Sequence, residues 1–157
     1  MKKTIMNKWV KALRSGKYKQ GREKLCTVNG TTGNESYCCL GVLTDLYLKE
    51  RKRQKKGPNI KFFHTYTKED MDHDCNFSKW EIDGEDGCLP PEVAEWAGFD
   101  TSTDDYRTGC FVKPNNQEID LALLNDGGLD PTDVSKTTKP KSFKQIADVI
   151  EKNYEHI

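Results

Sequence analysis

The sequence lacks any long apolar run. Its mean hydropathy is −0.85, and no stretch approaches the roughly 18 apolar residues that a membrane-spanning helix needs. The start of the chain, residues 1–8, is basic, but no apolar segment typical of a secretion signal follows it. These absences argue against a membrane protein and against a secreted one. We therefore expect a cytoplasmic protein.

Motifs that carry chemistry are also sparse. The chain has three histidines, none of them in a recognisable catalytic context, and the GK[ST] ending of a phosphate-binding P-loop is absent. Residues 69–75 gather Asp, Glu, His and Cys, but their spacing matches neither an EF-hand nor a zinc site. We expect a solvated acidic loop there, with no bound metal and no cofactor.

Six cysteines are present, at positions 26, 38, 39, 75, 88 and 110. Without a secretion signal, reduced thiols are expected rather than disulfides. Cys38 or Cys39 at a helix N-terminus could form a reactive thiolate, because the helix dipole lowers a thiol pKa. A buried structural role is favoured, since a cysteine nucleophile needs a nearby base. We predict no catalytic residue.

The length and the composition of the chain are those of a single folded domain. Its 157 residues and 10% aromatic content are typical of a single folded domain, which we place over residues 1–157. The net charge of zero hides a division: residues 1–56 carry 15 Lys and Arg against 4 Asp and Glu, whereas residues 57–157 carry 10 against 21. Such a division indicates either a surface for an anion or two parts that neutralise each other.

Helical spacing of apolar residues predicts four helices and one shorter helical turn. The helices are expected over residues 3–14, 38–53, 91–97 and onward from the capping box Ser142–Gln145, and the turn over residues 118–124. Gly16 and Gly98 occupy positions where a left-handed residue ends a helix. Gly41, inside an apolar helix start, indicates close packing against another backbone.

Strand signals are weaker than the helical ones. Strands are expected at residues 25–28, 60–66, 77–82 and 110–112. Residues 29–34 are a predicted hairpin tip, and residues 131–141 a polar connection. Trp80 has polar neighbours and is expected at the surface. The sequence therefore predicts a single compact α+β domain, with about four helices packed on a small, mainly antiparallel sheet.

Residues 13–22 form the first segment suited to ligand binding. Two glycines allow the backbone to approach a ligand closely. The candidate ligand-binding side chains here are Arg14, Lys17, Tyr18, Gln20 and Arg22. The cations suit phosphate or carboxylate, the tyrosine suits stacking on a base, and the glutamine suits polar edges. The alternative is a helix end followed by a solvated turn.

A second segment offers polar groups near the C-terminal helix. Asn125 and Asp126 precede two glycines, and Ser142 follows after a polar stretch. Asn125 and Asp126 are candidate partners for a base or ribose, and Ser142 is a further candidate ligand-binding residue. Asp126 could act as a general base, but no second carboxylate accompanies it at a fixed spacing. The alternative is ordinary turn and helix-cap chemistry.

Five short sequence motifs are informative when they are considered together. They are W-x2-ALRSGKYKQG at residues 9–21, YCCLGVL at 37–43, LP-x2-V-x2-WAG at 89–98, LND at 124–126 and SF-x2-IAD-x-IE at 142–151. With them the chain resembles a family of small accessory proteins of tailed bacteriophages. It departs from that pattern at Thr44, where relatives often have a second cysteine, and in a longer segment at 130–141.

The resemblance implies a protein that acts in the cytoplasm of an infected bacterium. Such accessory proteins often counter host defence by binding a defence protein, or by sequestering or cleaving a nucleotide signal. An analogy of this kind indicates the biological setting of a protein, but it does not identify the reaction that the protein performs.

Together, the residues and the resemblance favour a binding module that sequesters a small phosphorylated, nucleotide-like ligand. A homo-oligomer is compatible with such a site. The alternatives are a hydrolase of phosphodiester bonds or nucleotide signals, and a protein-binding inhibitor of a host defence factor. Binding is favoured over catalysis because no acid–base pair has convincing spacing. Nucleic acid is not the expected partner, since the domain as a whole is not basic.

Overall fold

The computed structural model describes residues 1–57, 76–80, 87–99, 111–112, 119–130 and 133–156. Within them the chain forms an α+β fold of five α-helices and short antiparallel strands, which confirms the predicted fold class. The helices are α1 (Lys3–Arg14), α2 (Cys39–Arg53), α3 (Pro91–Ala97), α4 (Leu121–Asp126) and α5 (Phe143–Lys152), with the 3₁₀ turn η3 (Tyr154–His156) after them. The strands are β1 (Cys26–Asn29), β2 (Glu35–Tyr37), β3 (Asn76–Ser78), β4 (Phe111–Val112), β5 (Ile119–Asp120), β6 (Gly128–Asp130) and β7 (Asp133–Thr138).

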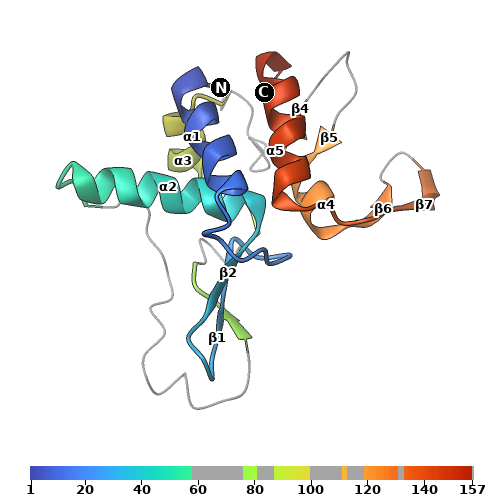
Figure 1. Cartoon of the computed structure of the whole chain (residues 1–157), viewed down its shortest axis with the longest axis horizontal. Coiled ribbons are helices and arrows are strands. Elements are labelled where there is room, and N and C mark those ends of the chain that lie inside the picture. Colours follow the sequence, from blue (N-terminus) through green and yellow to red (C-terminus); the bar gives the residue numbers. More distant parts are fainter. Residues whose placement is uncertain (58–75, 81–86, 100–110, 113–118, 131–132, 157) are drawn as a thin grey trace.

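Helix α1 packs along α5, and the two lie side by side with both chain ends at the same end of the molecule (Figure 1). Its apolar residues recur at helical spacing and are buried in one stripe, formed by Ile5, Met6, Trp9, Val10 and Leu13. The Trp9 indole donates a hydrogen bond to the Cys39 carbonyl at 2.9 Å. Gly16 follows the helix with a φ of 69°, as predicted for its C-terminal end.

Helix α2 crosses below α1, and its first half forms the centre of the core (Figure 1). It begins at the N-cap Cys38, whose Sγ accepts a hydrogen bond from the Gly41 amide at 3.3 Å. A Cβ at Gly41 would lie well under 3.0 Å from the Leu25 carbonyl oxygen, so the predicted close backbone approach is confirmed. None of the described helices is long and apolar enough to cross a membrane.

A three-stranded antiparallel sheet, in the order β2-β1-β3, extends beneath α2 (Figure 1). Strands β1 and β2 form the predicted hairpin, with Cys26 opposite Tyr37. At its tip the Asn29 side chain accepts a hydrogen bond from the Thr32 amide at 2.8 Å. Two further antiparallel pairs, β4–β5 and β6–β7, lie on the side of α4 and α5.

The structure corrects three of the sequence predictions. Trp80 is buried, with 5% of its surface exposed, because β3 pairs with β1 and brings its ring to 5.8 Å from that of Tyr37. The polar connection predicted at 131–141 is wrong, since Asp133–Thr138 pairs with β6 as a strand. The short helix starts later than predicted because Asp120 caps it, accepting bonds from the amides of residues 122 and 123.

Two sequence predictions fall on other parts of the chain. The predicted strand at 60–66 and the acidic loop at 69–75 lie outside the described residues. The strand predicted at 77–82 is present as Asn76–Ser78, and its predicted end also falls outside them. The capping box at Ser142 and Gln145 is confirmed by hydrogen bonds in both directions.

Candidate functional site

The predicted ligand-binding segment at 13–22 docks onto the start of α5. Gln20 makes this connection through both ends of its amide. Its Nε2 donates to the Lys141 carbonyl at 2.8 Å and to Asn125 Oδ1 at 3.1 Å, and its Oε1 accepts from the Phe143 amide at 3.0 Å. Residues that are far apart in the sequence are therefore held together by one side chain.

Asn125 completes this connection from inside the protein. Its side chain is fully buried, and its Nδ2 donates to the Gly21 carbonyl at 2.8 Å and to Asp126 Oδ1 at 2.6 Å. A buried amide is stable only when its donors and acceptor are paired, and here they are. Gln20 and Asn125, which the sequence proposed as ligand contacts, therefore bind each other and the backbone.

The segment before α5 is fixed just as firmly to the end of α4. The Lys141 amide donates to the Leu124 carbonyl at 2.7 Å. Gly127 has a φ of 74°, and a Cβ there would lie 2.7 Å from both the Thr138 carbonyl oxygen and Pro140 Cδ. Only glycine fits such a position without strain. Residues 139–142 are thus held at the same junction as residues 19–22.

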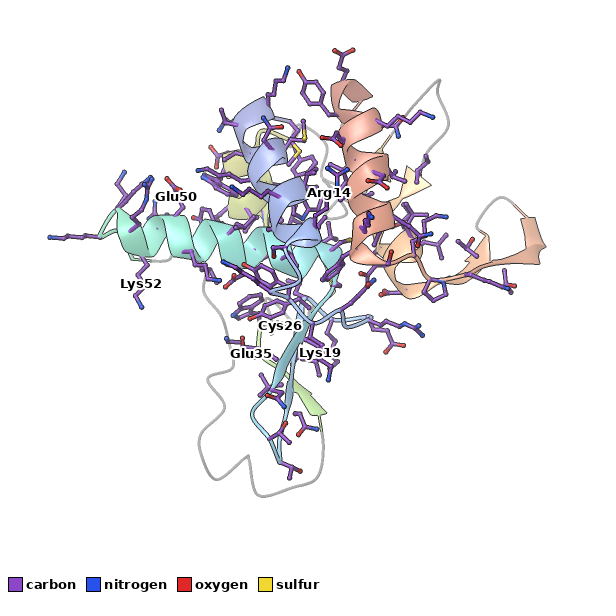
Figure 2. The ribbon with its side chains drawn as sticks, in the orientation of Figure 1. Arg14, Lys19, Cys26, Glu35, Glu50 and Lys52 are labelled. Atoms are coloured by element: carbon purple, nitrogen blue, oxygen red, sulfur yellow. The ribbon has the colours of Figure 1, made fainter. Side chains whose placement is uncertain are left out.

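Three other predicted residues are engaged within the protein. Figure 2 shows Arg14 reaching between α1 and α5, where it pairs with Asp148 at 2.5 Å and Glu151 at 2.7 Å. Hydrogen bonds to Glu151 and Asp148 raise the pKa of Arg14. Ser142 caps α5. Tyr18 donates to Asp45 at 2.5 Å.

Six cations lie on or next to the two docked segments, and we call this set of residues the basic junction. It comprises Lys17, Lys19, Arg22, Lys139, Lys141 and Lys144. Lys141 is half-buried and the other five are exposed. None of the six side chains has a hydrogen bond or ion pair with any residue in the described parts of the chain. Their charge is therefore available to an anion.

Two of the six residues of the basic junction were among the candidates from the sequence. Lys17 and Arg22 were candidates and Lys19 lies between them, whereas Lys139, Lys141 and Lys144 were missed. The available signal was the short spacing of three lysines around the Ser142 capping box. Two carboxylates also lie next to residues of this region in the sequence. Half-buried Asp126 follows Asn125, and Glu23 follows Arg22.

A second polar cluster lies beneath α2 and repeats one arrangement twice. Tyr18 donates to Asp45, which pairs with Lys49 at 2.6 Å. In the same way, Tyr37 donates to Glu35, which pairs with Lys79. The Tyr18 and Tyr37 rings meet edge to face, with 5.2 Å between their centres, so the two units form one cluster. We call it the tyrosine cluster.

The pKa values of the tyrosine cluster indicate a structural role. Burial, and then the hydrogen bond to Asp45, raise the pKa of Tyr18. Burial, and then the hydrogen bond to Glu35, raise the pKa of Tyr37. Burial raises the pKa of Cys26, which lies beneath α2 (Figure 2), to about 12. At neutral pH these groups stay protonated, so none of them is a ready nucleophile.

Glu35 makes the stability of this cluster depend on pH. Burial raises the pKa of Glu35, but hydrogen bonds from Lys79 and Tyr37 outweigh it and lower the pKa below 4.5. The resulting stabilisation is present above pH 4.5 and is lost as the pH falls through the lowered pKa of the folded state. We expect Glu35→Gln to lower the free energy of unfolding by about 1 kcal/mol at pH 7, because the pair is only partly buried.

Urea denaturation at several pH values measures this effect. The difference between wild type and Glu35→Gln should shrink as the pH is lowered from about 6 to about 3. Glu155→Gln, at an exposed position of η3, should leave the free energy of unfolding unchanged across that range. A Glu35→Gln difference that stays constant with pH would contradict the assigned role.

Comparison with known proteins gives the family. A family model described as a domain of unknown function, DUF8296, matches residues 1–154. The chain belongs to the DUF8296 family. The match includes both segments of the basic junction and the whole tyrosine cluster. No curated protein and no solved structure matches this DUF8296 chain. Within the described residues, no three His, Cys, Asp or Glu side chains are grouped to hold a metal ion.

Proposed function

We propose that this DUF8296 protein is a binding module that captures a small phosphorylated, nucleotide-like ligand at the basic junction and holds it intact. The supporting observation is the set of six cations, without partners in the described residues, on two segments that Gln20 and Asn125 hold together. Because Gln20 and Asn125 hold the backbone of both segments in place before a ligand arrives, binding does not have to order these segments, which favours affinity. The raised pKa values of Cys26 and Tyr37 support binding rather than nucleophilic attack by these groups.

The predicted site residues have different roles in this function. Lys17 and Arg22, with Lys19 and the three later lysines, contact the anion. Gln20, Asn125 and Ser142 keep the two segments in place, and Arg14 joins α1 to α5. Tyr18 is half-buried between Lys49 and Tyr37, with the Lys49 Nζ 5.1 Å from its ring centre, so it connects the segment that carries Lys17 and Lys19 to α2.

The resemblance to phage accessory proteins supplies the proposed setting. In it, the protein is an accessory protein of a tailed bacteriophage that acts in the host cytoplasm and withholds a nucleotide signal from host defence. Sequestration needs only pre-organised contacts, and it fits an anion site without an activated nucleophile.

Charge reversal tests the proposed site. Isothermal titration with ADP-ribose and with a cyclic dinucleotide is expected to show binding that weakens as salt is raised. The double variant Lys19→Glu/Lys141→Glu should weaken it by tenfold or more, roughly 1.4 kcal/mol. Lys52→Glu/Lys56→Glu, at exposed positions in the last turn of α2 and just beyond it, makes the same change in net charge and should have little effect. Equal losses in both variants would contradict a localised site.

A further inference from the structure

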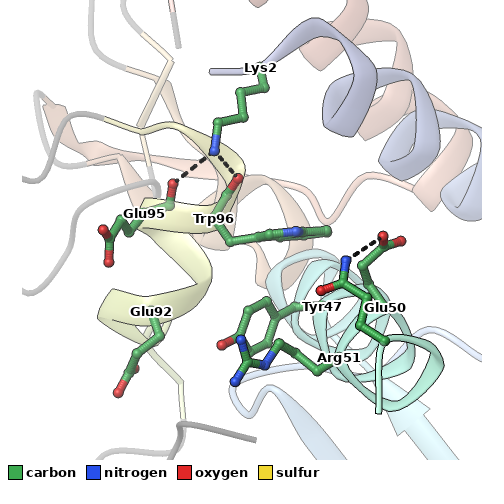
Figure 3. A pocket seen from close by; sticks show the side chains of 8 residues that line it. Lys2, Tyr47, Glu50, Arg51, Glu92, Glu95 and Trp96 are labelled. Atoms are coloured by element: carbon green, nitrogen blue, oxygen red, sulfur yellow. Dashed lines mark hydrogen bonds between the residues drawn. The ribbon is translucent and has the colours of Figure 1, made fainter. Parts of the chain in front are cut away.

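A pocket lies away from the basic junction, between α3 and the last turns of α2. Its volume is about 260 Å³. It is lined by Lys2, Tyr47, Glu50, Arg51, Gln54, Glu92, Glu95 and Trp96. Figure 3 shows the Trp96 indole lying across it above Tyr47 and Arg51, with Glu92 and Glu95 toward the other side.

Two aromatic rings form the apolar part of this pocket. The rings of Tyr47 and Trp96 meet at 66° with 5.5 Å between their centres. Tyr47 is buried, whereas Trp96 is half-exposed. The Arg51 guanidinium lies 6.0 Å from the centre of the Tyr47 ring, so the protein's own arginine already uses one of these rings. Trp96 keeps surface that an incoming planar cation can cover.

The two cations of the pocket are already bound to neutral carbonyl groups. The Lys2 Nζ donates to the Trp96 carbonyl at 2.8 Å and to the Glu95 carbonyl at 3.5 Å. Arg51 donates to the Gly57 carbonyl from Nε at 3.1 Å and from its terminal nitrogen at 2.8 Å. Both cations are thereby held in place by backbone oxygens.

The carboxylates differ in how far they are neutralised. Glu50 accepts from Lys8 at 3.2 Å and from Arg53 at 2.8 Å. By contrast, the side chains of Glu92 and Glu95 have no hydrogen bond or ion pair with any residue that the structure describes. These two residues are one helical turn apart on α3 and so share a face. The lining of the pocket therefore offers two carboxylates without partners among the described residues, together with a half-exposed indole.

We propose that this pocket binds an arginine side chain of a partner polypeptide. A guanidinium is planar, stacks on an aromatic face and donates in a fork to carboxylates, which matches Trp96 with Glu92 and Glu95. A volume of about 260 Å³ accommodates one long side chain rather than a folded element. This site is independent of the basic junction, and it gives the protein a means to bind a protein as well as an anion.

Capped arginine, N-acetyl-arginine amide, is the probe that tests the proposal. Trp9 and Trp80 are 0% and 5% exposed, so a change in tryptophan fluorescence reports mainly on Trp96. Titration by fluorescence and by calorimetry should show saturable binding, with a Kd on the order of 1 mM for so small a ligand. Capped citrulline has the same shape without charge and should not bind. Capped lysine should bind at least several-fold more weakly.

Variants identify the groups responsible. Glu92→Gln/Glu95→Gln should weaken the binding of capped arginine by about tenfold. Trp96→Phe should abolish the fluorescence response, while calorimetry should still detect weak binding. Glu155→Gln should bind like wild type. The proposal is overturned by an absence of binding up to about 50 mM, by equal binding of citrulline or lysine, or by a double variant that binds normally.

Discussion

Gly41→Ala is expected to destabilise the protein strongly, lowering the free energy of unfolding by about 3 kcal/mol or more. The new methyl group would lie well under 3.0 Å from Leu25 O, and also within 3.0 Å of the Leu25 carbonyl carbon. These are backbone atoms that lead into β1, so no side-chain rotation relieves the overlap. The buried half of α2 would have to separate from the sheet.

Chemical denaturation compares this variant with a matched one. Gly57→Ala adds the same methyl group where no atom of the described residues lies within 4 Å and where the backbone is not left-handed. We expect it to change the free energy of unfolding by less than about 0.5 kcal/mol. If Gly41→Ala changed the free energy of unfolding as little as Gly57→Ala, this result would contradict the close contact between α2 and Leu25.

Asn125→Leu is expected to have the second largest effect, because it removes the buried connection behind the basic junction. Leucine keeps most of the volume but leaves the Gly21 carbonyl without the donor that now lies 2.8 Å away, and takes one acceptor from Gln20. A buried polar group without a partner costs about 1–3 kcal/mol, so we expect a loss of about 2–3 kcal/mol. Binding of the phosphorylated ligand should weaken as well, since residues 19–22 lose their anchor.

Asn153→Leu separates this effect from the general cost of losing an asparagine. Asn153 is half-buried at the C-terminal end of α5, and among the described residues its Nδ2 donates to the Val149 carbonyl alone, at 2.8 Å. Its replacement should cost less than about 1 kcal/mol and leave ligand binding unchanged. Equal losses of stability and binding in the two variants would show that Asn125 has no special part in holding the junction.

Local features of this fold could be predicted from the sequence because they depend on neighbouring residues. The stripe on α1 follows from helical spacing, and the start of α5 follows from the Ser142 capping box. Gly98 ends α3 with a φ of 77°, as its position after an apolar turn indicated. The close backbone contact at Gly41 could be predicted as well, although its partner Leu25 was not identifiable.

Features that depend on distant residues could not be predicted in this way. Gln20 and Asn125 are 105 residues apart, and their polarity fits a ligand contact as well as a buried connection. Trp80 has polar neighbours in the sequence, and only the pairing of β3 with β1 shows that its ring packs on Tyr37. The later lysines joined the candidate site for the same reason, since Gln20 bonds to the Lys141 carbonyl.

The most direct test of the proposed function is a native mass spectrum of the protein purified from infected bacterial cells, followed by denaturation and analysis of what is released. We predict that the folded protein retains a small phosphorylated molecule, that this molecule is recovered intact, and that Lys19→Glu/Lys141→Glu loses it. The same spectrum reports whether one copy or several hold it. Release of cleaved products, or protein that carries no small anion while binding none of the added nucleotides, would contradict the proposal.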